Sequence, residues 1–118
     1  MSKLDKLRSR YLEDPIPVRL GGLAANLARV ASFSKHDGHQ QAVSATLQES
    51  KWFIEWTAGE LDMRETAELV TLQLQLAIWQ LQSEKKWQDR CWRSELVSQS
   101  QRWSQRLLHL SGVGVKEN

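Results

Sequence analysis

The sequence has few of the residues that interrupt a helix or crosslink a chain. Its 118 residues include one cysteine, two prolines and six glycines, and no glycine or proline lies between Gly59 and Gly112. A single cysteine excludes a disulfide scaffold, and so little glycine and proline excludes a collagen-like chain. No apolar run approaches the roughly 18 residues that a membrane-spanning helix needs, and the charged start MSKLDKLRSR does not resemble a secretory signal. We therefore expect a cytoplasmic protein with a single helical domain over residues 1–111 and a flexible tail over 112–118.

Groups of residues that carry chemistry are also scarce. His36 and His39 in HDGH could form a metal pair, but no cysteine or third histidine lies near them at ligand spacing, and an exposed turn is the more ordinary interpretation. Cys91 has no cysteine partner and is interpreted as a small packing residue. The sequence contains no pair of Glu-x-x-His motifs, no convincing acid/base pair and no serine or cysteine triad. We therefore expect a protein that is not an enzyme and that holds no metal or cofactor.

Apolar residues at helical spacing predict three helices in the first half of the chain. A short amphipathic helix is predicted over residues 3–13, and longer helices are predicted over 17–35 and 40–57. Ser2 is placed to cap the first helix, and Pro17 suits the first turn of the second. Gly59 is placed to end the third.

Residues 71–82, TLQLQLAIWQLQ, begin with the alternation of a β-strand. The alternation fails where three apolar residues follow one another, and the segment lies inside a long run of helix-forming residues. At about 100° per residue, a helix collects the apolar side chains on two faces. The first face holds Val70, Leu74, Ala77, Ile78 and Leu81, and the second holds Leu69, Leu72, Leu76 and Trp79. We therefore predict a helix that needs partners on two sides.

The same helical pattern continues to about residue 110. Asp62 followed by Glu65 resembles a capping box at its start. A continuous helix over 62–110 would be about 70 Å long, which exceeds the width of a compact domain of this size. Either the helix breaks near 83–86, or a second subunit covers its end, and we favour the second subunit because the six tryptophans each favour a large buried surface. The predicted fold is an all-α bundle of three or four helices, with a short N-terminal helix and a long C-terminal helix.

The long C-terminal helix carries the candidate interaction surface. Its first apolar face continues past residue 84 with little in the rest of the chain to cover it. The residues of this candidate surface are Trp87, Trp92, Leu96, Trp103, Leu107 and Leu110. The function predicted from it is a helical protein–protein interaction or regulatory module that acts as a homodimer, with another protein as a further partner.

Charge is unevenly distributed along the chain. Residues 1–35 carry a net charge of +4, residues 36–84 carry −6, and residues 85–118 carry +4. The basic ends can lie against the acidic middle, or they can form an anion-binding surface. The alternative function is therefore binding of single-stranded nucleic acid through residues 85–106, where tryptophans would stack on bases. The candidate phosphate contacts are Lys85, Lys86, Arg90, Arg93, Arg102 and Arg106.

Three segments together resemble a known family. They are DPIPVRLGGLAANLARVASFS, ESKWFIEWTA and AELVTLQLQLAIWQLQ. The combination looks like a small all-helical family of uncharacterised proteins from cyanobacteria, over nearly the whole chain. The resemblance implies a cytoplasmic protein, and it implies no catalytic or binding residues.

Overall fold

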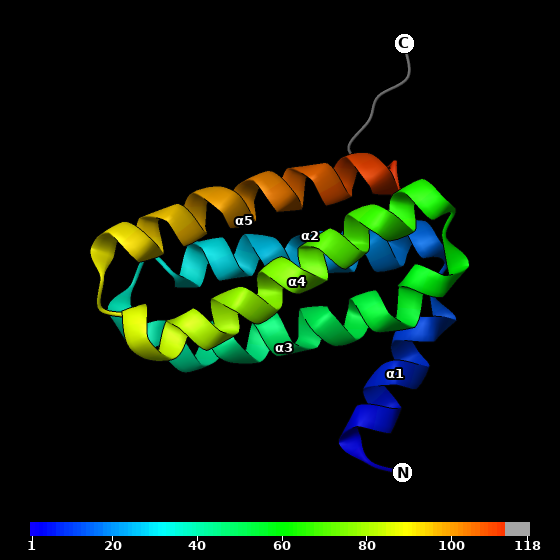
Figure 1. Ribbon diagram of the computed structural model, residues 1–118. Helices are drawn as coiled ribbons and strands as arrows, with labels where there is room; N and C mark the ends of the chain where they lie inside the picture. The colour runs from blue at the N-terminus through cyan, green and yellow to red at the C-terminus, as the bar shows by residue number, and fades with distance from the viewer. Residues whose placement is uncertain (113–118) are drawn as a thin grey trace.

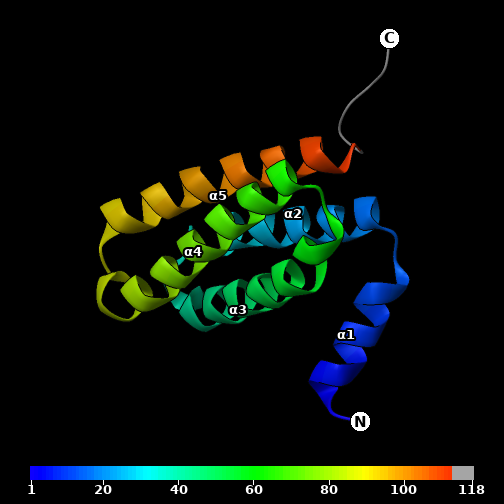
Figure 2. The same cartoon turned by 45° about the vertical axis from the view of Figure 1, so that its right-hand side comes forward.

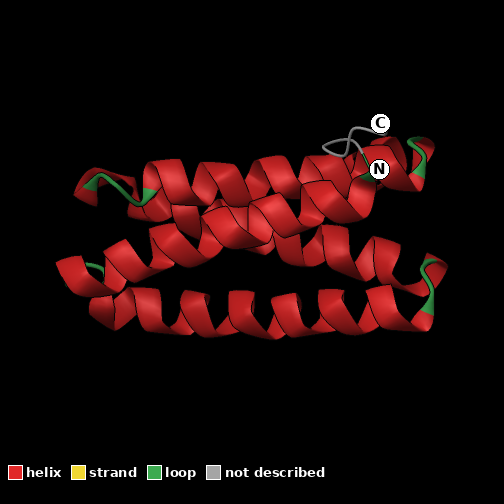
Figure 3. Cartoon of the chain, turned by 90° about the horizontal axis from the view of Figure 1, so that it is seen from above, coloured by secondary structure: helices red, strands yellow, loops and turns green. Residues whose placement is uncertain are grey.

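The computed structural model describes residues 1–112, and this part of the chain contains helices and no strand. The helices are α1 (Lys3–Glu13), α2 (Ile16–Phe33), α3 (Gln40–Thr57), α4 (Met63–Lys86) and α5 (Arg90–Ser111), with short 3₁₀ turns η1 (Asp37–His39) and η2 (Ala58–Glu60). Helices α2 to α5 run alternately up and down and form a four-helix bundle (Figure 1). The connections between these four helices lie at the two ends of the bundle (Figure 3). The predicted all-α bundle is confirmed, whereas the predicted tail lies, apart from Gly112, outside the described residues.

The helix ends follow the capping signals in the sequence. Ser2 accepts a hydrogen bond from the backbone N–H of Asp5 at 3.0 Å, and Asp5 in turn accepts from the N–H of Ser2 at 3.3 Å. Asp62 accepts from the N–H of Glu65 at 2.7 Å, so it caps α4 as predicted. Helix α5 ends at Gly112, whose φ of 78° is a left-handed conformation that glycine adopts without steric cost.

The long helix predicted over 62–110 is broken into two helices, because the chain reverses at residues 87–89. Helix α4 ends at Lys86, and the carboxylate of Asp89 caps the start of α5 by accepting from the N–H groups of Cys91 and Trp92 at 2.9 and 3.2 Å. Trp87 is buried in the turn, and its indole Nε1 donates to the backbone oxygen of Asp37 at 2.6 Å. A buried tryptophan and a capping aspartate therefore reverse the chain without glycine or proline. The break lies just after the predicted alternative at 83–86, and no second subunit is needed to cover the end of a long helix.

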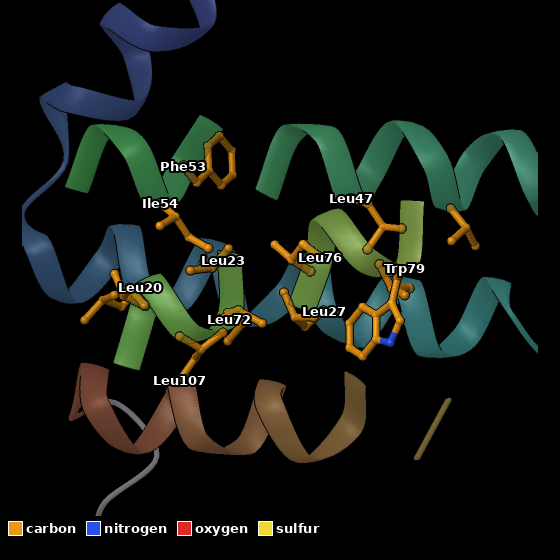
Figure 4. Packing of buried hydrophobic residues seen from close by; sticks show 14 of the residues in the cluster. Leu20, Leu23, Leu27, Leu47, Phe53, Ile54, Leu72, Leu76, Trp79 and Leu107 are labelled. Atoms are coloured by element: carbon orange, nitrogen blue, oxygen red, sulfur yellow. The ribbon is translucent and has the colours of Figure 1, made fainter. Parts of the chain in front are cut away.

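The core lies between the four bundle helices, as Figure 4 shows. All four helices contribute leucines that are fully or almost fully buried, including Leu23, Leu47, Leu76 and Leu107. Helices α2 and α5 approach closely because small side chains, among them Ala24 and Ser104, face each other. The hydroxyl of Ser104 donates to the backbone oxygen of Ala24 at 2.7 Å, which satisfies a buried polar group at this contact.

Helix α1 lies beside the bundle and is anchored at its C-terminal end (Figures 1 and 2). Tyr11, its one buried residue, stacks on Phe53 of α3 with ring centroids 4.0 Å apart. The Tyr11 hydroxyl donates to the backbone oxygen of Arg19 at 3.0 Å and accepts from the Thr57 hydroxyl at 3.3 Å. Arg19 also donates to Glu60 at 2.8 Å, so the start of α2 is tied to η2, the turn that follows α3.

Candidate functional site

The outer face of α4 carries a row of exposed apolar side chains. Leu74 is 64% exposed, Leu81 is 74% exposed and Val70 is 53% exposed. Leu72 and Leu76, on the opposite face of the same helix, are completely buried. The prediction of two apolar faces is confirmed, but the bundle covers only the second of them. We call the uncovered row the α4 stripe, and it consists of Ala67, Val70, Leu74, Ile78 and Leu81.

Glutamines along both edges of the α4 stripe attach it to the neighbouring helices. On the α3 side, Gln73 donates to the backbone oxygen of Lys51 at 3.4 Å, and the Lys51 ammonium donates to Gln80 at 2.9 Å. On the α5 side, the Gln82 oxygen accepts from the indole N–H of Trp92 at 3.0 Å. These bonds hold the rotation of α4 about its own axis, so the uncharged side chains of the stripe face away from the bundle.

The interaction surface predicted on the last helix is not a free surface of this chain. Trp87, Leu96 and Leu107 are buried in the core. The remaining members are partly buried and pack against the same core, namely Trp92, Trp103 and Leu110. The physical reason is the reversal at residues 87–89, which turns the apolar side of α5 inward onto α2 and α4. The uncovered apolar surface therefore stays on α4 and, apart from Ala67, consists of residues that the sequence had placed on the same face.

The six candidate anion contacts fall in three places and form no continuous strip. Lys85 and Lys86 are exposed at the end of α4. The other four lie on α5, where Arg90 and Arg93 are about half a turn around the helix from Arg102 and Arg106.

Ion pairing and burial also limit what these basic residues and tryptophans can offer to a nucleic acid. Arg106 is paired with Glu68 at 2.8 Å. Trp87, one of the predicted stacking residues, is in the core and inaccessible to a base.

The residues considered for metal or thiol chemistry are exposed. His36 and His39 lie in an exposed turn, as predicted, with ring centroids 5.4 Å apart. Within residues 1–112, no group of three or more histidine, cysteine, aspartate or glutamate residues could hold a metal ion. Cys91 is exposed on α5, so its interpretation as a packing residue is wrong. It lies in the first turn of α5.

Comparisons with protein-family models, with curated proteins and with solved structures find no match to this chain. None of the helices that the structure describes combines the length and the apolar character needed to cross a membrane.

Proposed function

We propose that the protein is a helical interaction module that forms a homodimer, and that the α4 stripe of one copy packs against the α4 stripe of the other. The observation that carries the proposal is the uncovered stripe itself. Exposed apolar patches rimmed by polar residues mark interaction sites in soluble proteins. The partner that fits the stripe best is a second copy of the chain, because of the symmetry and the charge of α4.

The stripe is symmetric about Leu74. Val70 and Ile78 lie four residues before and after it, and Ala67 and Leu81 lie seven residues before and after it. In a two-fold dimer the same patch meets itself. When two α4 helices pack antiparallel with Leu74 on the axis, Leu74 meets its own copy, Val70 meets Ile78, and Ala67 meets Leu81. An apolar side chain thus faces an apolar side chain at every position of the stripe.

The charges at the two ends of α4 complement one another in the same arrangement. Arg64 and Glu84 lie ten residues before and after Leu74, and Asp62 and Lys86 lie twelve residues before and after it. Each pair brings opposite charges to the same level along the helix axis, on opposite flanks of the stripe, and each occurs twice in the dimer. A parallel arrangement would instead place like charges together. Exposed ion pairs contribute only about 0–1 kcal/mol each, so they select the orientation more than the affinity.

The size of the stripe sets the expected strength of the dimer. One helix against its copy buries less than the roughly 1,200 Å² that a stable standard interface covers. We therefore expect a dimer that forms at micromolar or higher concentration. Every substitution in the stripe acts twice, because both copies carry it.

Sedimentation equilibrium over a range of concentrations tests the dimer. Leu74→Asp places two carboxylates against each other on the axis, so we expect this variant to remain a monomer with unchanged helical circular dichroism. Val18→Asp is the matched control, because Val18 is a half-exposed apolar residue on α2 outside the stripe. A monomeric wild type, or equal loss of association in both variants, would contradict the proposal.

Cysteine crosslinking with a short bis-maleimide tests the register, in a background where exposed Cys91 is replaced by serine. Two Leu74→Cys copies meet at the axis and should crosslink. Two Leu81→Cys copies should not, because their cysteines lie about 21 Å apart along the helix. A mixture of Leu81→Cys and Ala67→Cys chains should crosslink. A crosslink between two Leu81→Cys copies, with none between Leu81→Cys and Ala67→Cys chains, would assign a parallel dimer.

A further inference from the structure

The end of α2 and the start of α5 lie at the end of the bundle away from α1 (Figure 1). A cleft opens between residues of these two segments. Its volume is about 630 Å³, which is within the range of small-molecule sites. We call it the end cleft. It is lined by Ser34, Lys35, His36, Asp37, Arg90, Arg93, Ser94 and Val97, and it shares no residue with the α4 stripe.

The side chains of the end cleft have an excess of positive charge. Lys35, Arg90 and Arg93 contribute three cations, and Asp37 contributes one carboxylate. The ion pairs within the described part of the chain are Arg19–Glu60 and Arg106–Glu68, so no carboxylate neutralises the three cations directly. Unpaired basic groups that converge on a cleft attract an anion.

Two buried polar atoms of the end cleft have no hydrogen-bond partner. Ser34 is only 1% exposed and its hydroxyl is unpaired, and the Nε of Arg93 is also buried and unpaired. Glu68 holds the only other buried side-chain atom of this kind in the described residues. Buried polar groups are normally paired because an unpaired one costs stability. Arginine Nε only donates, so the group that would satisfy it is an acceptor oxygen.

Trp87 contacts both walls of the end cleft. Its indole N–H bonds the backbone of Asp37 on one wall, and the Arg93 guanidinium of the other wall lies 5.5 Å from the centre of its ring. The end of α2 and the start of α5 also lie side by side, so their opposite helix dipoles largely offset each other. The side chains therefore determine the sign of the potential in the cleft.

We propose that the end cleft binds the phosphate group of a small phosphorylated molecule. Arg90, Arg93 and Lys35 supply the charge, and guanidinium groups match phosphate oxygens in pairs. Ser34 forms part of the wall and supplies a further donor. The half-buried Val97 leaves an apolar side for the organic part of the ligand. The proposal is independent of the homodimer.

Titration of the ¹⁵N-labelled protein with inorganic phosphate at constant ionic strength tests the site by NMR. We expect saturable shifts of the backbone signals of residues 34–37 and 90–97, and of the side-chain Nε–H of Arg93. Arg90→Gln should weaken binding about tenfold, because a charge-assisted hydrogen bond is lost. Arg102→Gln is the matched control on the other side of α5 and should not change binding. Shifts that do not saturate, or equal effects of the two variants, would overturn the proposal.

Further measurements distinguish a ligand site from a group of residues that only stabilises the fold. Arg90 is exposed, so its replacement tests binding without a loss of packing. Ser34→Ala removes an unpaired buried hydroxyl, and we expect a higher Tm together with several-fold weaker phosphate binding. An unchanged phosphate affinity in Ser34→Ala would overturn the role of the hydroxyl. A thymidylate oligonucleotide that shifts the signals of Lys85 and Arg102 as strongly as those of the cleft would assign the surface to nucleic acid and overturn the small-ligand proposal.

Discussion

Raising the pH above 10 should release α1 from the bundle through the ionisation of Tyr11. Burial raises the pKa of Tyr11 from the ordinary 10.0 to about 12, and the hydrogen bond from Thr57 opposes part of this rise. The phenol oxygen that would become charged lies against Arg19 and Thr57 inside the protein. Because Tyr11 is the one buried residue of α1, its charge state decides whether α1 remains docked.

The magnitude follows from the difference between the two pKa values. Below pH 10 both the docked and the undocked tyrosine are protonated, so pH has no effect through this group. Between pH 10 and 12 the undocked tyrosine loses its proton and the docked one retains it, so stability falls as pH rises. The loss is about 1.4 kcal/mol per pH unit and reaches about 2.7 kcal/mol near pH 12.

The sequence contains one tyrosine, so ultraviolet absorbance of tyrosinate reports this residue alone. We expect the absorbance of the folded protein to rise well above pH 10, together with a loss of protection of α1 from proteolysis. Tyr11→Phe is the control, because it retains the ring stacked on Phe53 and cannot ionise. All other residues are the same in both proteins, so the difference between them isolates Tyr11. A tyrosinate midpoint near 10 in the folded protein, or the same pH dependence in both proteins, would refute the reasoning.

Two further predictions concern α4. Arg64→Glu should weaken the homodimer, and adding Glu84→Arg to the same chain should restore it, as measured by sedimentation; a double variant weaker than the single one would exclude the antiparallel pairing. Leu72→Ala should lower the free energy of unfolding by about 2–5 kcal/mol, because Leu72 is completely buried. Leu74→Ala in monomeric protein should change the free energy of unfolding by less than about 1 kcal/mol, because Leu74 is exposed. Urea unfolding measures both, and equal losses would mean that Leu74 belongs to the core.

Much of the fold could be predicted because it depends on local sequence. The helices at 3–13 and 40–57 agree with the structure at both ends. The reversal after α4 could not be predicted in the same way, because the turn contains no glycine or proline. It depends on the hydrogen bond from Trp87 to Asp37, which lies 50 residues away in the chain. It also depends on Asp89, which in the sequence alone resembles an ordinary residue inside a helix.

Only part of the candidate site could be predicted, because only part of it depends on local sequence. The apolar faces of residues 69–81 follow from the helical period, and the structure buries the face that contains Leu72 and Trp79. Extending the other face past residue 86 assumed an unbroken helix. Once the helix breaks, the rotation of α5 is set by its contact with α2, so side chains such as Leu96 and Leu107 face inward. The end cleft joins residues 34–37 to residues 90–97, and no local pattern connects these segments.

The close contact between α2 and α5 has a consequence for how the chain folds. The Ser104 hydroxyl and the Ala24 oxygen that it bonds are 80 residues apart, and they join the first and the last helix of the bundle. The other neighbours in the bundle are consecutive in the chain and can pair early through short loops. During synthesis, the apolar side of α2 therefore stays without its final partner until the last helix has left the ribosome. An incomplete chain that ends before α5 would expose that side, which makes it a substrate for chaperones and proteases.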